Sequence, residues 1–272
     1  MFDFGAARAG GEGETEPMTT MGFLDHLEEL RKRIVYSLMA VAVGFFACWW
    51  KVERIYDVMQ RPIIDVLRKN HMPEKLVYLN PTDPFNLYIK IAALAGLFLT
   101  SPFVLYQVWM FISPGLYRNE KRYVVPFMIS TIALFTTGGY FGYKIAYPMA
   151  LDFLIGFGKQ FMPMITISEY TQLFLTIILG MGIIFEMPIL VFFLSFMGIL
   201  SAGFMVKNFR YAIMVIFIVA AIVTPTTDIL SMCIFASPMI ALYGVSIGVA
   251  WLVHPTQRRA REELKKEKQA QA

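Results

Sequence analysis

The sequence has little of what metal proteins, disulfide-rich proteins and many enzymes depend on. Its two cysteines, Cys48 and Cys233, both lie in apolar runs, which excludes a disulfide framework and a CxxC motif. Its three histidines, His26, His71 and His254, are too scattered to indicate a metal site. A P-loop and an HExxH pair are also missing, so neither a nucleotide-driven motor nor a zinc hydrolase is indicated. We therefore expect no catalysis, no cofactor and no nucleic-acid partner.

Charge is equally scarce. Charged residues make up 16% of the 272 residues and hydrophobic residues 57%, whereas a soluble domain averages about 25% and about 45–50%. This composition excludes a soluble domain and predicts a membrane protein. A carboxylate at mid-bilayer depth then needs an explanation, because inserting one costs roughly 2.5–3.5 kcal/mol.

Long apolar runs account for most of the chain. Crossing a hydrocarbon core about 30 Å thick takes roughly 20 helical residues, and we predict six spans: 34–50, 91–112, 124–147, 172–197, 211–224 and 229–253. The last two flank "TPTTD" at 224–228 and form a short hairpin, since 14 residues in the fifth run reach only about 21 Å. Prolines in or beside the spans should kink them: Pro102, Pro126, Pro188 and Pro238. The predicted fold is an all-α membrane protein of six transmembrane helices, kinked into a concave bundle, with short fifth and sixth spans.

The distribution of basic residues predicts the orientation. Lysine and arginine number 15 in the terminal segments and loops on the side of the two termini, and seven over 51–87 and 148–171 on the other side, and cytoplasmic segments carry the excess. Both termini are therefore expected in the cytoplasm. We predict a disordered leader over 1–18, a membrane domain over 19–253, and a charged cytoplasmic tail over 254–272 that is a solvated helix or a disordered end.

Two stretches on the predicted cytoplasmic face carry acidic residues. "GFLDHLEELRKRIVY" at 22–36 has apolar residues at helical spacing, which predicts a short interfacial helix entering the first span. Its acids have local partners at i, i+4, Lys32 for Glu28 and Arg33 for Glu29. In "SPGLYRNEKR", Glu120 lies among basic residues, so a solvated turn with a local counter-charge explains it equally well.

Four motifs in order resemble the TatC family, the multispanning receptor subunit of the twin-arginine protein translocase. They are "HLEELRKR", "SPFVLYQVWMFISPGLYRNEKR", "GIIFEMP" and "TPTTD", and the similarity covers about residues 20–253. The resemblance implies a non-enzymatic receptor and core subunit that binds twin-arginine signal peptides at the cytoplasmic face. It also implies single-span TatA and TatB type partners, a multimeric complex in the bacterial cytoplasmic (inner) membrane, and export of folded proteins driven by the proton motive force.

The resemblance also assigns a signal-peptide site. Two guanidinium groups pair best with two carboxylates, because these contacts are bidentate and charge-assisted. By the family motifs, the carboxylates are those of Glu29 and Glu120, with Glu28 as a second candidate beside Glu29. The other implied positions are one aromatic and two basic residues: Phe111, Arg31 and Arg118.

The same resemblance places an intramembrane carboxylate on the concave face. Glu186 lies in "GIIFEMPILVFFLSF", with no other charged residue from Tyr170 to Val206. Two roles are open: a hydrogen bond to a polar residue on a partner's transmembrane helix, or local thinning and hydration of the membrane. The structural alternative is an internal hydrogen bond to Thr176, Ser195 or a neighbouring span.

Three further positions match family motifs. Asp228 follows the Thr-Pro turn, where it either caps the sixth helix or contacts partner helices or the signal hairpin. The turn is one residue longer than the "TPPD" of many relatives, so its geometry stays open. Pro62 is expected at a helix edge and Phe85 as an apolar anchor, both as scaffold of the first outer loop that caps the concave face.

A secondary transporter of a small cation through Glu186 and Asp228 is the alternative function. Inverted repeats with paired broken helices would indicate one. The two halves of the chain show no convincing similarity to each other, which favours the translocase subunit.

Overall fold

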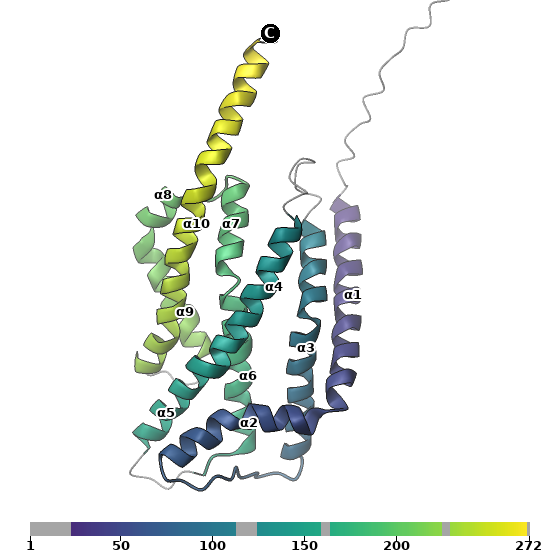
Figure 1. Ribbon diagram of the computed structural model, residues 1–272, viewed down its shortest axis with the longest axis vertical. Coiled ribbons are helices and arrows are strands. Elements are labelled where there is room, and N and C mark those ends of the chain that lie inside the picture. The colour runs from purple at the N-terminus through teal and green to yellow at the C-terminus, as the bar shows by residue number, and fades with distance from the viewer. Residues whose placement is uncertain (1–22, 113–123, 159–163, 225–228, 271–272) are drawn as a thin grey trace, which may run out of the picture.

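The structure, a computed structural model, describes residues 23–112, 124–158, 164–224 and 229–270 (Figure 1). Within these ranges the regular elements are helices, so the predicted all-α class is confirmed. In chain order they are α1 (Phe23–Trp49), α2 (Val52–Lys69), α3 (Asp83–Ile112), α4 (Val124–Phe141), the π-helix η3 (Gly142–Ala146), α5 (Tyr147–Phe157), α6 (Ile167–Ile184), α7 (Met187–Phe196), α8 (Ala202–Lys207), α9 (Phe209–Val223) and α10 (Ile229–Ala270).

The helices differ in their capacity to cross a membrane. Four segments of the described chain are long and apolar enough: His26–Trp49, Asp83–Phe111, Ile167–Phe196 and Phe235–Leu252. Residues Phe209–Ile222 form a shorter apolar helix, as expected for the fifth run. The sixth run belongs to α10, a helix of 42 residues that continues through the predicted tail, so the helix itself is not short. The chain is a multi-pass membrane protein, while the count of six spans stays a prediction.

Close packing of α1 on α3 rests on two glycines. A Cβ atom added to Gly96 would lie 2.6 Å from the backbone nitrogen of Phe45, and one added to Gly44 would lie 2.7 Å from the carbonyl oxygen of Gly96. Real side chains do not approach backbone this closely, so any larger residue would force the helices apart. The two helices therefore run side by side along their length (Figure 1).

A π-helical turn joins α4 to α5. The N–H of Tyr147 donates to the carbonyl of Gly142, a wider turn than the α-helical one. Pro148 follows directly and has no N–H to continue the α pattern, which accounts for the wider turn at this point. The bulge turns Tyr143 toward α2, where its hydroxyl group donates to a backbone carbonyl.

Helix α2 lies across one end of the bundle, roughly perpendicular to α1 and α3 (Figure 1). Pro62 is inside α2 and buried, so the expectation that it sits at a helix edge is wrong. A proline leaves the carbonyl four residues earlier without its helical donor, and that carbonyl belongs to Val58. Tyr143 donates its hydroxyl to this carbonyl at 2.6 Å, and Tyr170 donates to the carbonyl of Met59 at 2.9 Å. The carbonyl freed by the proline thus docks α2 onto η3, and the adjacent carbonyl of Met59 docks it onto α6.

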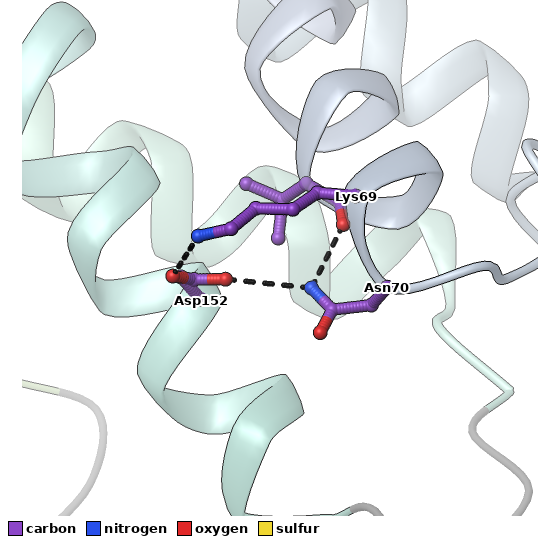
Figure 2. Close-up of polar contacts among 4 residues, drawn as sticks. Lys69, Asn70 and Asp152 are labelled. Atoms are coloured by element: carbon purple, nitrogen blue, oxygen red, sulfur yellow. Dashed lines mark hydrogen bonds and ion pairs between the residues drawn. The ribbon is translucent and has the colours of Figure 1, made fainter.

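Polar contacts hold the C-terminal end of α2 and the segment after it. Lys69 donates to Asp152 of α5 at 2.6 Å (Figure 2), and Asn70 donates to the carbonyl of Val66 at 2.9 Å. Further on, the N–H of Val77 donates to the carbonyl of Ile165, in an isolated parallel bridge just before α6. The first outer loop of the sequence prediction is therefore largely an ordered layer on α3, α5 and α6.

The fourth predicted span is interrupted between α6 and α7, at the position where Pro188 was expected to kink it. Pro188 cannot donate to the carbonyl of Ile184, and α6 ends at that residue. Pro102 and Pro238, in contrast, lie within the continuous helices α3 and α10. Pro126 falls in the first turn of α4, where the N–H has no helical acceptor in any case. The helix is therefore broken at one of the four predicted positions, and kinks at the others stay a prediction.

Candidate functional site

The start of α1 and the end of α3 meet at the end of the bundle opposite α2, which we call the terminal face (Figure 1). Here the ring of His26 stacks on the ring of Phe111, with centroids 4.4 Å apart and planes 21° apart. Phe111 is one of the residues assigned to the signal site, and its ring is half-buried. An aromatic platform is thus already formed from two helices.

A polar chain runs beside this platform. The guanidinium group of Arg33 donates to Oε1 of Glu29 at 3.1 Å and to Oε1 of Gln107 at 2.9 Å. The side chains of Glu29 and Arg33 are only 18% and 22% exposed, and Gln107 is 4% exposed. Within this group of three side chains, Oε2 of Glu29 and Nε of Arg33 are buried and have no hydrogen-bond partner among the residues that the structure describes. The arrangement therefore leaves one hydrogen-bond acceptor and one donor available side by side.

The two neighbouring glutamates differ in their surroundings. The predicted i, i+4 pair of Glu29 with Arg33 is confirmed. Glu28 is exposed, and the ammonium group of its predicted partner Lys32 lies 5.9 Å from the ring of Tyr36. In the described part of the chain, Glu28 and Lys32 form no ion pair. Of the two candidates, Glu29 is the one that faces α3.

Of the remaining predicted site residues, one is exposed and two lie outside the described ranges. Arg31 is exposed on α1, away from the contacts of Arg33. Glu120 and Arg118 lie in 113–123, outside the described residues. The structure thus brings Glu29 and Phe111 to the same end of the bundle and leaves the position of the second carboxylate as a prediction.

Three residues of the terminal face were missed as site residues: His26, Arg33 and Gln107. Arg33 entered the sequence argument only as a local partner of Glu29, although it also reaches a residue 74 positions away. Gln107 had a usable signal, since an uncharged amide in "FVLYQVWMF" needs a hydrogen-bond partner at membrane depth. His26 had none, because a lone histidine gives no indication of what it stacks on.

Glu186 occupies the break between α6 and α7. Its backbone bridges the two helices, donating to the carbonyl of Ile183 at 3.1 Å and accepting from the N–H of Leu190 at 3.0 Å. Among the described residues, neither its buried Oε1 atom nor the buried hydroxyl of Ser195 has a hydrogen-bond partner. Of the structural alternatives, a hydrogen bond between the Glu186 carboxyl group and Ser195 or Thr176 is therefore not formed among the described residues. The carboxyl group lies in the segment Ile167–Phe196 with a polar atom available.

The other predicted positions are scaffold or undescribed. Asp228 lies in 225–228, outside the described residues. Just before it, Thr224 closes α9 with its hydroxyl donating to the carbonyl of Ala220 at 2.9 Å. Phe85, in the first turn of α3, is 59% exposed but packs edge-on against Trp49 with centroids 6.1 Å apart. Its assignment as an anchor stays a prediction that this contact supports.

The chemistry available at these positions is binding through charge and hydrogen bonds. Across the part of the chain that the structure describes, no cluster of three or more His, Cys, Asp or Glu could hold a metal ion. The fold and the terminal face define a multi-pass helical membrane protein with a partly unsatisfied polar site between α1 and α3.

Comparison with known proteins identifies the family. The family model described as "Sec-independent protein translocase protein (TatC)" matches residues 25–238. The chain is 66% identical over 248 residues to the TatC protein of Koribacter versatilis, covering 91% of this chain and 92% of that protein. It is 32% identical to that of Aquifex aeolicus, covering 90% and 100% of the two chains. The chain belongs to the TatC family.

A solved structure agrees with this assignment. The crystal structure titled "Twin Arginine Translocase Receptor- TatC" superposes with a TM-score of 0.74 at 33% identity, covering 84% of this chain and 99% of that one. The chain is therefore a subunit of the Sec-independent protein translocase, a transport component and not an enzyme. Family membership also favours this function over the alternative of a small-cation transporter.

Proposed function

We propose that this subunit is the signal receptor of its translocase and binds the twin-arginine motif at the terminal face. In this proposal both termini are cytoplasmic, six spans cross the bacterial inner membrane, and the terminal face is open to the cytoplasm. One arginine of the signal pairs with Glu29 and the other with Glu120. Charge-assisted bidentate pairing favours arginine over lysine at both positions.

The observation that carries the proposal is the state of Glu29. One of its carboxylate oxygens accepts from Arg33, while the other has no partner within the described ranges. An incoming guanidinium group can take the free oxygen and then displace Arg33, which keeps its hydrogen bond to Gln107. Arg33 thus holds the carboxylate in place before the signal binds. Gln107 holds Arg33 once the signal has displaced it from the carboxylate.

The assembly around this receptor follows from the family. We infer that TatA and TatB type subunits dock along the spans that carry Glu186 and Asp228, with membrane lipid around them in a multimeric complex. The unpartnered Oε1 of Glu186 supports a hydrogen bond to a partner helix, and hydration of the thinned bilayer is the alternative role. The proton motive force drives passage of the folded cargo.

A binding comparison tests the receptor proposal. Affinity is measured for a signal peptide with Arg-Arg and for the same peptide with Lys-Lys. Wild-type protein should prefer Arg-Arg by about ten-fold or more, because hydrogen bonds to charged groups contribute about 1.5–3 kcal/mol. Glu29→Gln and Glu120→Gln should each lose that preference.

Two control variants make the result specific. Glu28→Gln removes an exposed carboxylate one residue away and should keep the wild-type preference. Glu186→Gln should leave signal affinity nearly unchanged and reduce recovery of the partner subunits. Equal losses in Glu28→Gln and Glu29→Gln, or equal binding of the two peptides by wild-type protein, would refute the assignment of the site.

A further inference from the structure

A second site of defined chemistry lies at the opposite end of the bundle. A groove of about 530 Å³ opens between α1, α2, α3 and α6, beneath the N-terminal half of α2. Its walls are aliphatic and aromatic, with Cys48 from α1, Ile91, Leu94 and Phe98 from α3, and Phe174 from α6. None of the residues assigned to the signal site lines this groove.

Two cations stand at the rim of the groove. Lys51 and Arg54 line it, both are exposed, and no acidic residue is among its lining residues. In the described part of the chain neither side chain makes an ion pair or a hydrogen bond. Two unpaired cations beside an apolar groove are complementary to a molecule with an anionic head and a hydrocarbon tail.

Aromatic residues place the rim at headgroup depth. Trp50, next to Lys51 in the chain, is 88% exposed, and its neighbour Trp49 packs against Phe85. Tryptophan is enriched at the boundary between hydrocarbon and headgroups. From this level the groove follows α3 from Ile91 to Leu99, which at 1.5 Å per residue is about 12 Å into the hydrocarbon.

A neighbouring pocket on α2 differs from the groove in its charges, because acidic residues line it beside the basic ones. It has a volume of about 640 Å³ and is lined by Arg61, Lys69 and Lys144, but also by Asp65 and Asp152. Lys69 already pairs with Asp152 at 2.6 Å. That pocket therefore offers an anion little net charge, whereas the described residues that line the groove include Lys51 and Arg54 and no acidic residue.

We propose that this groove binds one anionic phospholipid from the leaflet at the α2 end of the bundle. Lys51 and Arg54 bind the phosphate group, and one acyl chain lies along Leu94 and Phe98 toward Phe174. The bound lipid fills the space between α2 and the long helices and so becomes part of the packing that holds α2 in place.

The test is lipid binding to the full-length protein after delipidation in detergent, measured by native mass spectrometry during titration with phosphatidylglycerol. Wild-type protein should retain one phosphatidylglycerol in preference to phosphatidylcholine. Lys51→Gln with Arg54→Gln should weaken this binding by at least about ten-fold, given the attraction of each basic residue to anionic lipid. Ala47→Phe keeps both charges but places a ring in the groove, and it should also weaken binding.

A matched control separates a site from general surface charge. Arg68→Gln with Lys75→Gln removes two cations from the same region of the chain, outside the groove, and should change affinity less than two-fold. Equal loss in this control and in the Lys51, Arg54 variant would overturn the proposal. So would unchanged binding by Ala47→Phe, or a groove that takes up an apolar transmembrane peptide in place of lipid.

Discussion

The two ends of the bundle differ in how certain polar groups are paired by hydrogen bonds. At the α2 end, the carbonyl that Pro62 leaves free is taken by the hydroxyl of Tyr143, and the next carbonyl by Tyr170. At the terminal face, Glu29 and Arg33 each have one buried polar atom that no described residue pairs with. At the α2 end these two backbone carbonyls are satisfied by side chains of the same protein, whereas at the terminal face two side-chain atoms of the proposed binding site stay available.

This difference separates scaffold from binding surface. An unsatisfied buried polar atom costs stability, so a chain retains one where a ligand or partner later supplies the missing bond. By the same reasoning, the two paired carbonyls of α2, one of them freed by Pro62, indicate docking of α2 on η3 and α6. We therefore expect changes at the α2 end to alter stability, and changes at the terminal face to alter binding.

Ile63→Ala should have the largest effect on stability. Ile63 lies on α2 and is fully buried, and truncating such a side chain costs about 2–5 kcal/mol. Thermal unfolding in detergent measures the loss, and affinity for the signal peptide should stay unchanged. Val58→Ala on the same helix, at a position 47% exposed, should cost less than about 1 kcal/mol. A large loss of signal affinity in Ile63→Ala would show that the two ends are coupled.

Gln107→Leu should act on binding without touching the ligand. Arg33 would lose its hydrogen bond to Gln107 and remain on Glu29, where it competes with the arginines of the signal. Affinity should fall by about two- to ten-fold, the equivalent of one hydrogen bond. Gln172→Leu, which changes an exposed glutamine on α6, is the control. Unchanged affinity in Gln107→Leu would mean that Arg33 does not compete for Glu29.

Tyr143→Phe should cost about 1 kcal/mol, because the carbonyl of Val58 loses its donor. The reason can be tested with a double-mutant cycle. In a Pro62→Ala background the new N–H can donate to that carbonyl within the helix, so removing the hydroxyl should then cost much less. Equal costs in both backgrounds would show that the hydroxyl of Tyr143 does not compensate for Pro62.

Arg68→Gln should have the smallest effect on stability. Arg68 makes two hydrogen bonds to Glu74, at 2.9 and 3.0 Å, on the surface after α2. Hydrogen bonding to the guanidinium group lowers the pKa of Glu74, so this pairing is present at neutral pH and is lost as the carboxyl group protonates in acid. An NMR titration should find the pKa of Glu74 higher in the variant, with an unchanged melting temperature. A clear drop in melting temperature would make this pair part of the scaffold.

Prediction from the sequence succeeded where neighbours in the chain decide the outcome. The apolar runs became helices, the i, i+4 spacing of Glu29 and Arg33 became an ion pair, and Pro188 accounts for the break beside Glu186. It failed at Pro62 and did not identify α2, an 18-residue helix. A half-apolar segment gives no signal as a membrane span, and its role depends on what it packs against.

The sequence by itself determined the class of this protein, the positions of its long helices and the family it belongs to. Hydrophobic length and local spacing are properties of consecutive residues, and four motifs in order are specific. Only the tertiary structure decided that Arg33 reaches Gln107, that His26 stacks on Phe111, and that Tyr143 replaces the bond lost at Pro62. These contacts join residues distant in the chain, so they exist only once glycine-mediated packing and the π-helical turn have brought the helices together.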